Sequence, residues 1–336
     1  MVRLAADDSR QQRGNAVGVR IRRASPAAWF VLILGATVGL ATCGRPIKST
    51  LPVPPTGKQL AELWTEPEPN RDLFNGVGGS RLAPDPSARY AVVDIKRGGF
   101  SSGYTVTDPA GREWSAKFPP EAATEVVASR ILWGVGFHQP PIYYVASWTA
   151  DKATSPNPQL PARFREKTPG LHGLDAKGEW SYYQNPFVGT RQLAGLLVLH
   201  AMLGNSDLKD GQNALYELDD TFEGAARWYV ARDLGQTFGR TGTLDAPRGD
   251  IAVFEQTPFI KGVVNGKVAF DYRGRHRALF RNIVPADVRW SCERLQRLSD
   301  KQWQDAFRAG GFPPALGARF IHRMRQKIAE GLALKD

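Results

Sequence analysis

The feature that most constrains the fold is an ordered series of short elements that begins at Arg89. A β-rich run at 90–97 leads into the glycine-rich turn GGFSSG at 98–103. Two further strand-like runs, YTVTD and REWSAKF, follow with the tight turn PAG between them. The next segment starts with two prolines, which a helix tolerates only in its first turn, and it keeps a helical pattern until a pair of glycines. This order predicts a small β-rich unit that includes one helix.

The rest of the chain has mainly helical patterns. A loop-like stretch from Thr149 to about Gly189 precedes TRQLAGLLVLHAML, whose leucines occupy most faces and indicate a buried helix. FIKGVVNGKVAFDY predicts a hairpin around Asn265 and Gly266, and helical patterns complete the last hundred residues. The sequence therefore predicts a mixed α+β fold.

The first 43 residues predict an export signal or a membrane anchor. An arginine-rich arm precedes an uncharged apolar run that starts at Ala27 and stops at Cys43. The run is short for a membrane span and suits the core of a signal peptide. Its end, LATC, resembles the lipobox of bacterial lipoproteins, in which the cysteine is acylated. We expect either lipidation at Cys43 or an uncleaved anchor, and both place the following residues on the extracytoplasmic face of the membrane.

The charge and the cysteine and histidine content argue against a nucleic-acid partner, an internal disulfide and a zinc site. The net charge is +11, but the N-terminal arm holds +4 of it and the remaining +7 is interspersed with many acids, so we expect no nucleic-acid partner. Cys292 is the only cysteine besides Cys43, which leaves no pair for an internal disulfide in an exported chain. The five histidines are dispersed and do not indicate a zinc site.

The glycine turn and Lys117 together predict a phosphate site. Glycines allow the backbone N–H groups of a turn to approach phosphates closely. Lys117, one strand later, would supply a fixed positive charge if an acid restrained it; Glu125 in the following helix is the first candidate and Glu121 the second. The turn contains three glycines: Gly98, Gly99 and Gly103.

In this order the chain resembles the protein-kinase-like superfamily over about residues 89–239. The triplet DLK followed by Asn213 resembles the kinase catalytic loop, and DLG at 233–235 resembles the metal-binding D-F-G triplet. The resemblance implies that Asp207 accepts the proton of a substrate hydroxyl and that Lys209 lies near the transferred phosphoryl group. It also implies that Asn213 and Asp233 bind Mg²⁺.

The catalytic-loop spacing differs from that of protein kinases. Asn213 lies six residues after Asp207 instead of five, so either one residue bulges out or Asp210 takes a role. No H-R-D is present; GNSD is more similar to the atypical kinases, such as HipA-type toxin kinases and secretory-pathway kinases. His200, on the apolar helix, is expected to be a core histidine rather than a catalytic base.

These observations predict a two-lobed, protein-kinase-like α+β fold. Its parts are a signal or anchor (1–43), a proline-rich tether (44–88), a β-rich small lobe (89–148) and a mainly helical large lobe (149–336). The expected activity is ATP- and Mg²⁺-dependent phosphoryl transfer to a hydroxyl of a protein or small molecule. Because ATP is expected to be scarce outside the bacterial cytoplasm, the alternative is a catalytically inactive, kinase-like binding protein of the cell envelope. A lipid-anchored structural protein without a nucleotide site is the third possibility.

Overall fold

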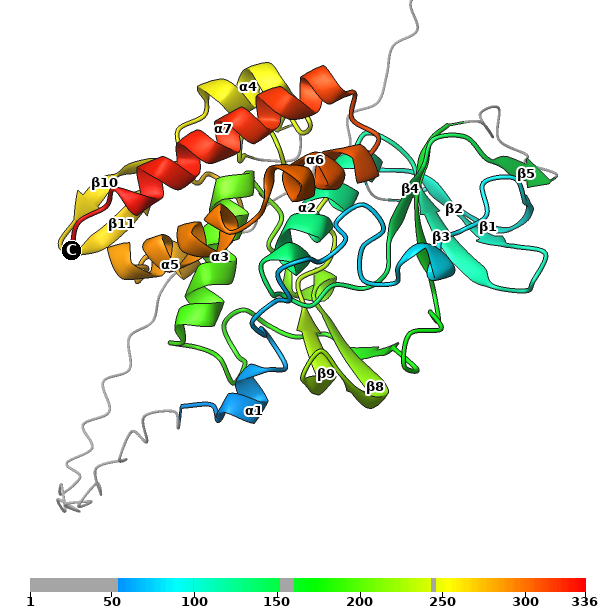
Figure 1. Ribbon diagram of the computed structural model, residues 1–336, viewed down its shortest axis with the longest axis horizontal. Helices are drawn as coiled ribbons and strands as arrows, with labels where there is room; N and C mark the ends of the chain where they lie inside the picture. Colours follow the sequence, from blue (N-terminus) through cyan, green and yellow to red (C-terminus); the bar gives the residue numbers. More distant parts are fainter. Residues whose placement is uncertain (1–53, 99, 152–159, 243–245) are drawn as a thin grey trace, which may run out of the picture. The chain divides into compact units, whose positions relative to one another are not determined.

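The part of the chain that the computed structural model describes contains a six-stranded sheet and seven α-helices (Figure 1). The described residues are 54–98, 100–151, 160–242 and 246–336. The expected signal or anchor at 1–43, with Cys43, and the expected phosphate-binding Gly99 lie outside them. The fold is mixed α+β, as the sequence predicts.

The sheet is built around an antiparallel meander of its first three strands. The strand order is β4-β6-β3-β2-β1-β5; β6 pairs antiparallel with β3, and β5 pairs parallel with β1. The sheet thus continues past residue 148, where the small lobe was expected to end, because β6 lies within the stretch expected to be a loop. The strands are β1 (Arg89–Lys96), β2 (Gly103–Thr107), β3 (Glu113–Lys117), β4 (Tyr143–Val145), β5 (Thr149–Asp151) and β6 (Ala162–Glu166).

The register of the sheet separates its two faces. Side chains alternate along a strand, and residues in lateral register point to the same face. One lateral row is apolar and belongs to the core: Tyr104, Ala116 and Phe164. The neighbouring row, on the opposite face, is polar and runs across four strands: Lys96, Gly103, Lys117 and Arg163.

Helix α2 (Ala122–Gly134) follows β3 and is buried on nearly all sides. It packs against β4 and β6 of the sheet and against α6 (Asp300–Ala309). The preceding Glu121 is its N-cap residue. The sequence predicts this helix, and its burial explains why apolar residues occur at nearly every position.

A second, three-stranded sheet determines which loops meet. Its strands are β7 (Asp175–Gly178), β8 (Ala214–Phe222) and β9 (Ala225–Val230), in that order. Helix α3 (Arg191–Leu203), buried as the sequence predicts, leads through residues 204–213 into β8. Because Ala214 pairs with Val230, the segment before β8 and the segment after β9 emerge side by side. The expected catalytic loop and the DLG triplet are therefore neighbours.

The C-terminal part is mainly helical, and α6 and α7, in orange and red, lie side by side (Figure 1). The expected hairpin is present, with positive φ at both Asn265 and Gly266. No helix among the described residues combines the length and apolar character needed to cross a membrane. The elements are α4 (Ile251–Gln256), β10 (Ile260–Val264), β11 (Lys267–Phe270), α5 (Pro285–Gln296), α6 and α7 (Pro314–Leu332).

The described part of the expected tether packs onto the fold. Residues 54–88 contain the short helix α1 (Gly57–Leu60), and Leu63 and Leu73 are completely buried. The Trp64 indole N–H donates to the Val135 carbonyl at 2.8 Å, just after α2. This segment therefore differs from a free tether, because Leu63 and Leu73 belong to the core even though prolines interrupt regular structure.

Candidate functional site

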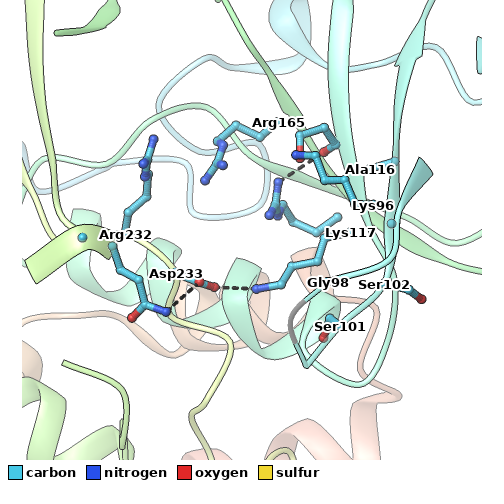
Figure 2. A pocket seen from close by; sticks show the side chains of 14 residues that line it. Lys96, Gly98, Ser101, Ser102, Ala116, Lys117, Arg165, Arg232 and Asp233 are labelled. Carbon is cyan, nitrogen blue, oxygen red and sulfur yellow. Dashed lines mark hydrogen bonds and ion pairs between the residues drawn. The ribbon is translucent and has the colours of Figure 1, made fainter. Parts of the chain in front are cut away.

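A pocket of about 190 Å³ opens between the polar face of the six-stranded sheet and the two loops that flank β8 and β9 (Figure 2). Strands β1, β2, β3 and β6 contribute one side, and residues 211–212 and 232–233 contribute the other. The pocket thus brings together segments more than one hundred residues apart in the sequence. Its lining residues are Lys96, Gly98, Ser101, Ser102, Gly103, Ser115, Ala116, Lys117, Arg163, Arg165, Gly211, Gln212, Arg232 and Asp233.

Lys117, the last residue of β3, contacts three carboxylates. Its Nζ lies 2.9 Å from an oxygen of Glu121, 2.9 Å from Glu125 and 2.5 Å from Asp233. Both acids weighed as partners from the sequence are therefore in contact with it. Burial disfavours the charged ammonium, but Glu125 and Asp233 outweigh this effect and raise the pKa of Lys117. The lysine is held as a cation in a fixed position.

Glu125 is buried on α2 and has a second cationic partner. Its Oε1 lies 3.0 Å from Nε of Arg163, whose Nη1 also donates to the Ser115 carbonyl at 3.2 Å. Burial opposes ionisation of Glu125, but Arg163 and then Lys117 lower its pKa to about 2. Sequence reasoning missed Arg163, because it lies in β6, within the stretch expected to be a loop.

Gln212 joins the two aspartates implied by the resemblance. Its Nε2 donates to Asp207 Oδ2 at 2.9 Å and to Asp233 Oδ2 at 3.0 Å. Gln212 lies five residues after Asp207, so no bulge is needed to bring a side-chain amide to this position. The Gln212 Oε1 atom is buried and accepts no hydrogen bond from the described residues. The signal in the sequence was the five-residue spacing itself, which points to Gln212 rather than to Asn213.

Asn213 and Asp210 face elsewhere. Asn213 is buried, and its Nδ2 donates to the Trp180 carbonyl at 3.2 Å, so no described contact joins it to Asp233. Asp210 accepts a hydrogen bond from the backbone N–H of Tyr182 at 3.1 Å, which links the loop before β8 to the segment before α3. The geometry therefore separates these two side chains from the group formed by Lys117 and Asp233.

Asp207 is buried, and its two carboxylate oxygens differ in their hydrogen bonds. Lys209 Nζ donates to its Oδ2 at 2.7 Å, while its Oδ1 lies 3.2 Å from Nε of Arg275 without hydrogen-bond geometry. The backbone N–H of Asp207 donates to Asn205 Oδ1 at 3.1 Å. A buried carboxylate oxygen without a donor is costly in a protein interior, which makes this oxygen a candidate acceptor for a substrate proton.

His200 supports this loop without facing the pocket. Its Nδ1 accepts from Asn205 at 3.1 Å, and its Nε2 lies 3.0 Å from the Tyr182 hydroxyl. Burial lowers the pKa of His200 to about 3, so the ring is neutral near pH 7. The structure agrees with the expectation of a core histidine.

At one position of the glycine turn, Gly103, the backbone lies so close to the neighbouring strand that a side chain would not fit. A Cβ on Gly103 would lie 2.3 Å from the Ala116 carbonyl oxygen, whereas one on Gly98 would meet nothing within 4 Å. Both glycines line the pocket. The turn is also tied to the start of α2, because Ser101 Oγ donates to Glu121 at 3.1 Å.

Arg248 adds a second link to the turn. Its guanidinium hydrogen-bonds Glu121 and lies 3.5 Å from the centre of the Phe100 ring. The segment after the DLG triplet therefore contacts both the glycine turn and the N-cap residue of α2.

The pocket is strongly basic. Five of its lining side chains are cationic and one, Asp233, is anionic, while Ala116 provides the only apolar side chain. The described residues contain no group of three His, Cys, Asp or Glu side chains placed to hold a metal ion. Asp233 and the unpaired Gln212 Oε1 supply two hard oxygens, a set that suits Mg²⁺ when a phosphate ligand supplies more. The cations are Lys96, Lys117, Arg163, Arg165 and Arg232.

Comparison with known proteins gives weak structural similarity and no match in sequence. No family model matches the chain, and no curated protein matches it. Among solved structures, the chain is similar to the crystal structure of a Helicobacter pylori proinflammatory kinase, CtkA. The TM-score is 0.39 and the sequence identity 11%, over 75% of this chain and 100% of that chain. At this TM-score the similarity does not establish a shared fold, so the proposals below rest on the geometry of the site.

Proposed function

We propose that this chain is a phosphotransferase with a two-lobed, protein-kinase-like fold. It transfers the terminal phosphoryl group of a donor such as ATP, with Mg²⁺, to a hydroxyl of a protein or small molecule. The observation that carries the proposal is the contact of Lys117 with both Glu125 and Asp233, which are 8 and 116 residues away in the sequence. A lysine fixed between a helix carboxylate and a candidate metal ligand is the arrangement that protein kinases use for phosphoryl transfer.

The proposed chemistry exchanges one P–O bond for another. The bond between the terminal phosphorus and the bridging oxygen of the donor breaks, and a bond to the acceptor oxygen forms. Asp207 Oδ1 takes the proton of the acceptor hydroxyl, and the shortened donor leaves with the electron pair of the broken bond. Lys117 and Lys209 hold the phosphates, and Gly98 and Gly103 allow the backbone to approach them.

Asp233 and Gln212 are the proposed Mg²⁺ ligands. The resemblance to kinases implies Asn213 instead, but its amide is engaged with Trp180. Gln212 Oε1 has no hydrogen-bond donor among the described residues and adjoins Asp233. Bound Mg²⁺ would neutralise charge that develops on the phosphates during transfer.

The segment before residue 54 supports a proposal about location. From the apolar run and LATC at Cys43, we propose attachment to the extracytoplasmic face of a membrane, by lipidation or by an uncleaved anchor. The acceptor would then be a hydroxyl-bearing molecule of the cell envelope.

The test of the phosphotransferase proposal is Asp207→Asn, with Asp210→Asn as the matched control. Removal of the proton acceptor is expected to lower the transfer rate by at least about 100-fold. Asp210→Asn is expected to retain more than half of the rate, because Asp210 contacts the Tyr182 backbone rather than the pocket. Transfer of labelled phosphate and circular dichroism are measured together. Equal rates for both variants and the unaltered chain would refute the role of Asp207.

An inactive, kinase-like binding protein remains the second candidate. The specific observation that favours it is Gln212, a longer amide than the asparagine that kinases place at this spacing. The same assay separates the two candidates: a chain that binds Mg²⁺ and a phosphate donor but transfers nothing is the binding protein.

A further inference from the structure

We propose that the pocket recognises a linear chain of phosphates and does not read a purine base. Inorganic polyphosphate, from tripolyphosphate upward, is therefore its ligand class, and the triphosphate of a nucleotide binds through the same contacts. The inference rests on the proposed function, since it names the donor class for that site. The observations that carry it are the placement of the cations, the lack of acidic partners for three of them among the described residues, and the near absence of apolar lining.

The sheet register places four cations on one face. Lys96, Lys117 and Arg163 share one lateral row, with Gly103 between the first two. Arg165 lies two residues further along β6, in register with Ser115, and therefore faces the same side. Neighbouring strands are about 4.8 Å apart, so the row spans three strand spacings, or about 14 Å. A ligand that meets the whole row must carry negative charge along its length.

Several of these cations are not neutralised by the protein. Within the described residues, no carboxylate forms an ion pair with Lys96, Arg165 or Arg232. Lys96 donates to the Ser115 hydroxyl at 3.4 Å, and Arg232 donates to the Tyr216 hydroxyl at 3.2 Å. Burial and then the charges of Arg165 and Arg163 lower the pKa of Lys96, as expected for a cation among cations. A bound anion would relieve this repulsion.

Figure 2 shows Lys96, Lys117, Arg165 and Arg232 around one open space. Guanidinium groups bind phosphate through paired N–H donors, which makes arginine well suited to a polyphosphate ligand. Asp233, the one carboxylate in the lining, is already paired with Lys117. The charge balance therefore favours an anion with several charges over a single phosphate.

A purine base has no matching surface. Sites for small organic ligands are mostly apolar and typically enclose roughly 300–1,000 Å³. This pocket encloses about 190 Å³, and its only apolar side chain is Ala116. Arg165 and Ser115, one polar pair further along β6 and β3 than Arg163 and Lys117, add polar side chains rather than a flat apolar surface to the lining. The space suits a short chain of phosphates better than a whole nucleotide.

The transfer step balances with such a donor. The terminal phosphoryl group of tripolyphosphate moves to the acceptor oxygen, the P–O bond to the bridging oxygen breaks, and pyrophosphate leaves with that electron pair. The proton of the acceptor hydroxyl passes to Asp207. Nucleotide-free donors would also resolve the expected scarcity of ATP outside the cytoplasm.

The experiment compares ligands by titration calorimetry of the purified full-length chain with Mg²⁺. Tripolyphosphate is expected to bind with a Kd within threefold of that of ATP, and adenosine is expected not to bind. The double variant Arg165→Gln/Arg232→Gln is expected to weaken tripolyphosphate binding at least tenfold. The control Arg89→Gln, on an exposed position of β1 in the same sheet, is expected to leave the Kd unchanged.

Two results would overturn the inference: ATP that binds more than tenfold tighter than tripolyphosphate, or a double variant that binds tripolyphosphate as the unaltered chain does. Transfer from labelled donors is measured separately. Arginine-dependent binding of tripolyphosphate without any transfer would support the ligand class and count against the phosphotransferase proposal. Binding that depends on the purine base, together with transfer, would support the phosphotransferase proposal and count against polyphosphate as the ligand class.

Discussion

Replacement of Glu125 by glutamine tests the electrostatic organisation of the site most directly. The side chain is buried between Arg163 and Lys117, and the substitution keeps its shape while it removes the charge. Lys117 retains Glu121 and Asp233, whereas among the described residues Arg163 retains the Ser115 carbonyl as its one polar partner. The variant thus leaves a buried guanidinium without a carboxylate partner, which is strongly destabilising.

The size of the effect follows from the pKa of Glu125. A pKa lowered from 4.5 to about 2 corresponds to about 3 kcal/mol of stabilisation near pH 7. Because the folded-state pKa lies below that of the unfolded chain, this stabilisation is fully present above about pH 4.5. It is lost as the pH falls through about 2. At pH 3.5 about 2 kcal/mol should remain.

Urea unfolding followed by tryptophan fluorescence measures the difference between Glu125→Gln and the unaltered chain at both pH values. Glu113→Gln is the matched control, because Glu113 forms an exposed ion pair with Lys167, whose loss should cost about 1 kcal/mol or less. The reasoning is refuted by a Glu125 effect below about 1 kcal/mol at pH 7, or by an effect that grows on acidification.

Two further predictions concern the glycine turn and the buried histidine. Gly103→Ala should destabilise the fold by about 1–3 kcal/mol, because the new Cβ meets the Ala116 carbonyl. The control Gly98→Ala should change the free energy of unfolding by less than about 0.5 kcal/mol. Equal effects of the two substitutions in urea unfolding would contradict this prediction. The His200 ring should show no NMR titration between pH 8 and 4.5, since burial lowers its pKa to about 3, and a midpoint near 6.5 would show that it is solvated.

Local sequence patterns were sufficient to predict the first three strands of the sheet and the helix that follows them. The strand-like runs at 90–97, 104–108 and 112–118 correspond to β1, β2 and β3 within a residue or two, and the proline start locates α2. Glycine turns and alternating residues act over a few positions, so they are readable without knowledge of the rest of the chain.

The residues that line the pocket could not all be predicted from the sequence, because their placement depends on strand pairings that no local sequence pattern reveals. In ARFRE of β6, two arginines alternate with apolar residues, and only the pairing with β3 turns them toward Lys117. The resemblance to kinases does not predict Gln212 as a site residue, because asparagine is the amide in the kinase catalytic loop, although the five-residue spacing favours position 212. Glu121 and Glu125 stayed alternatives because one helical turn separates them, and both reach the lysine.

The three carboxylates around Lys117 have a consequence for any measured affinity. Lys117 is already saturated in this structure, so an incoming phosphate must displace one of its partners. Glu121 is the partner best able to leave, because it lies at the start of α2 and keeps Arg248 and Ser101 as alternative contacts. Glu121 therefore competes with phosphate for Lys117, and a measured binding constant reports the difference in free energy between the contact of Lys117 with phosphate and its contact with this carboxylate.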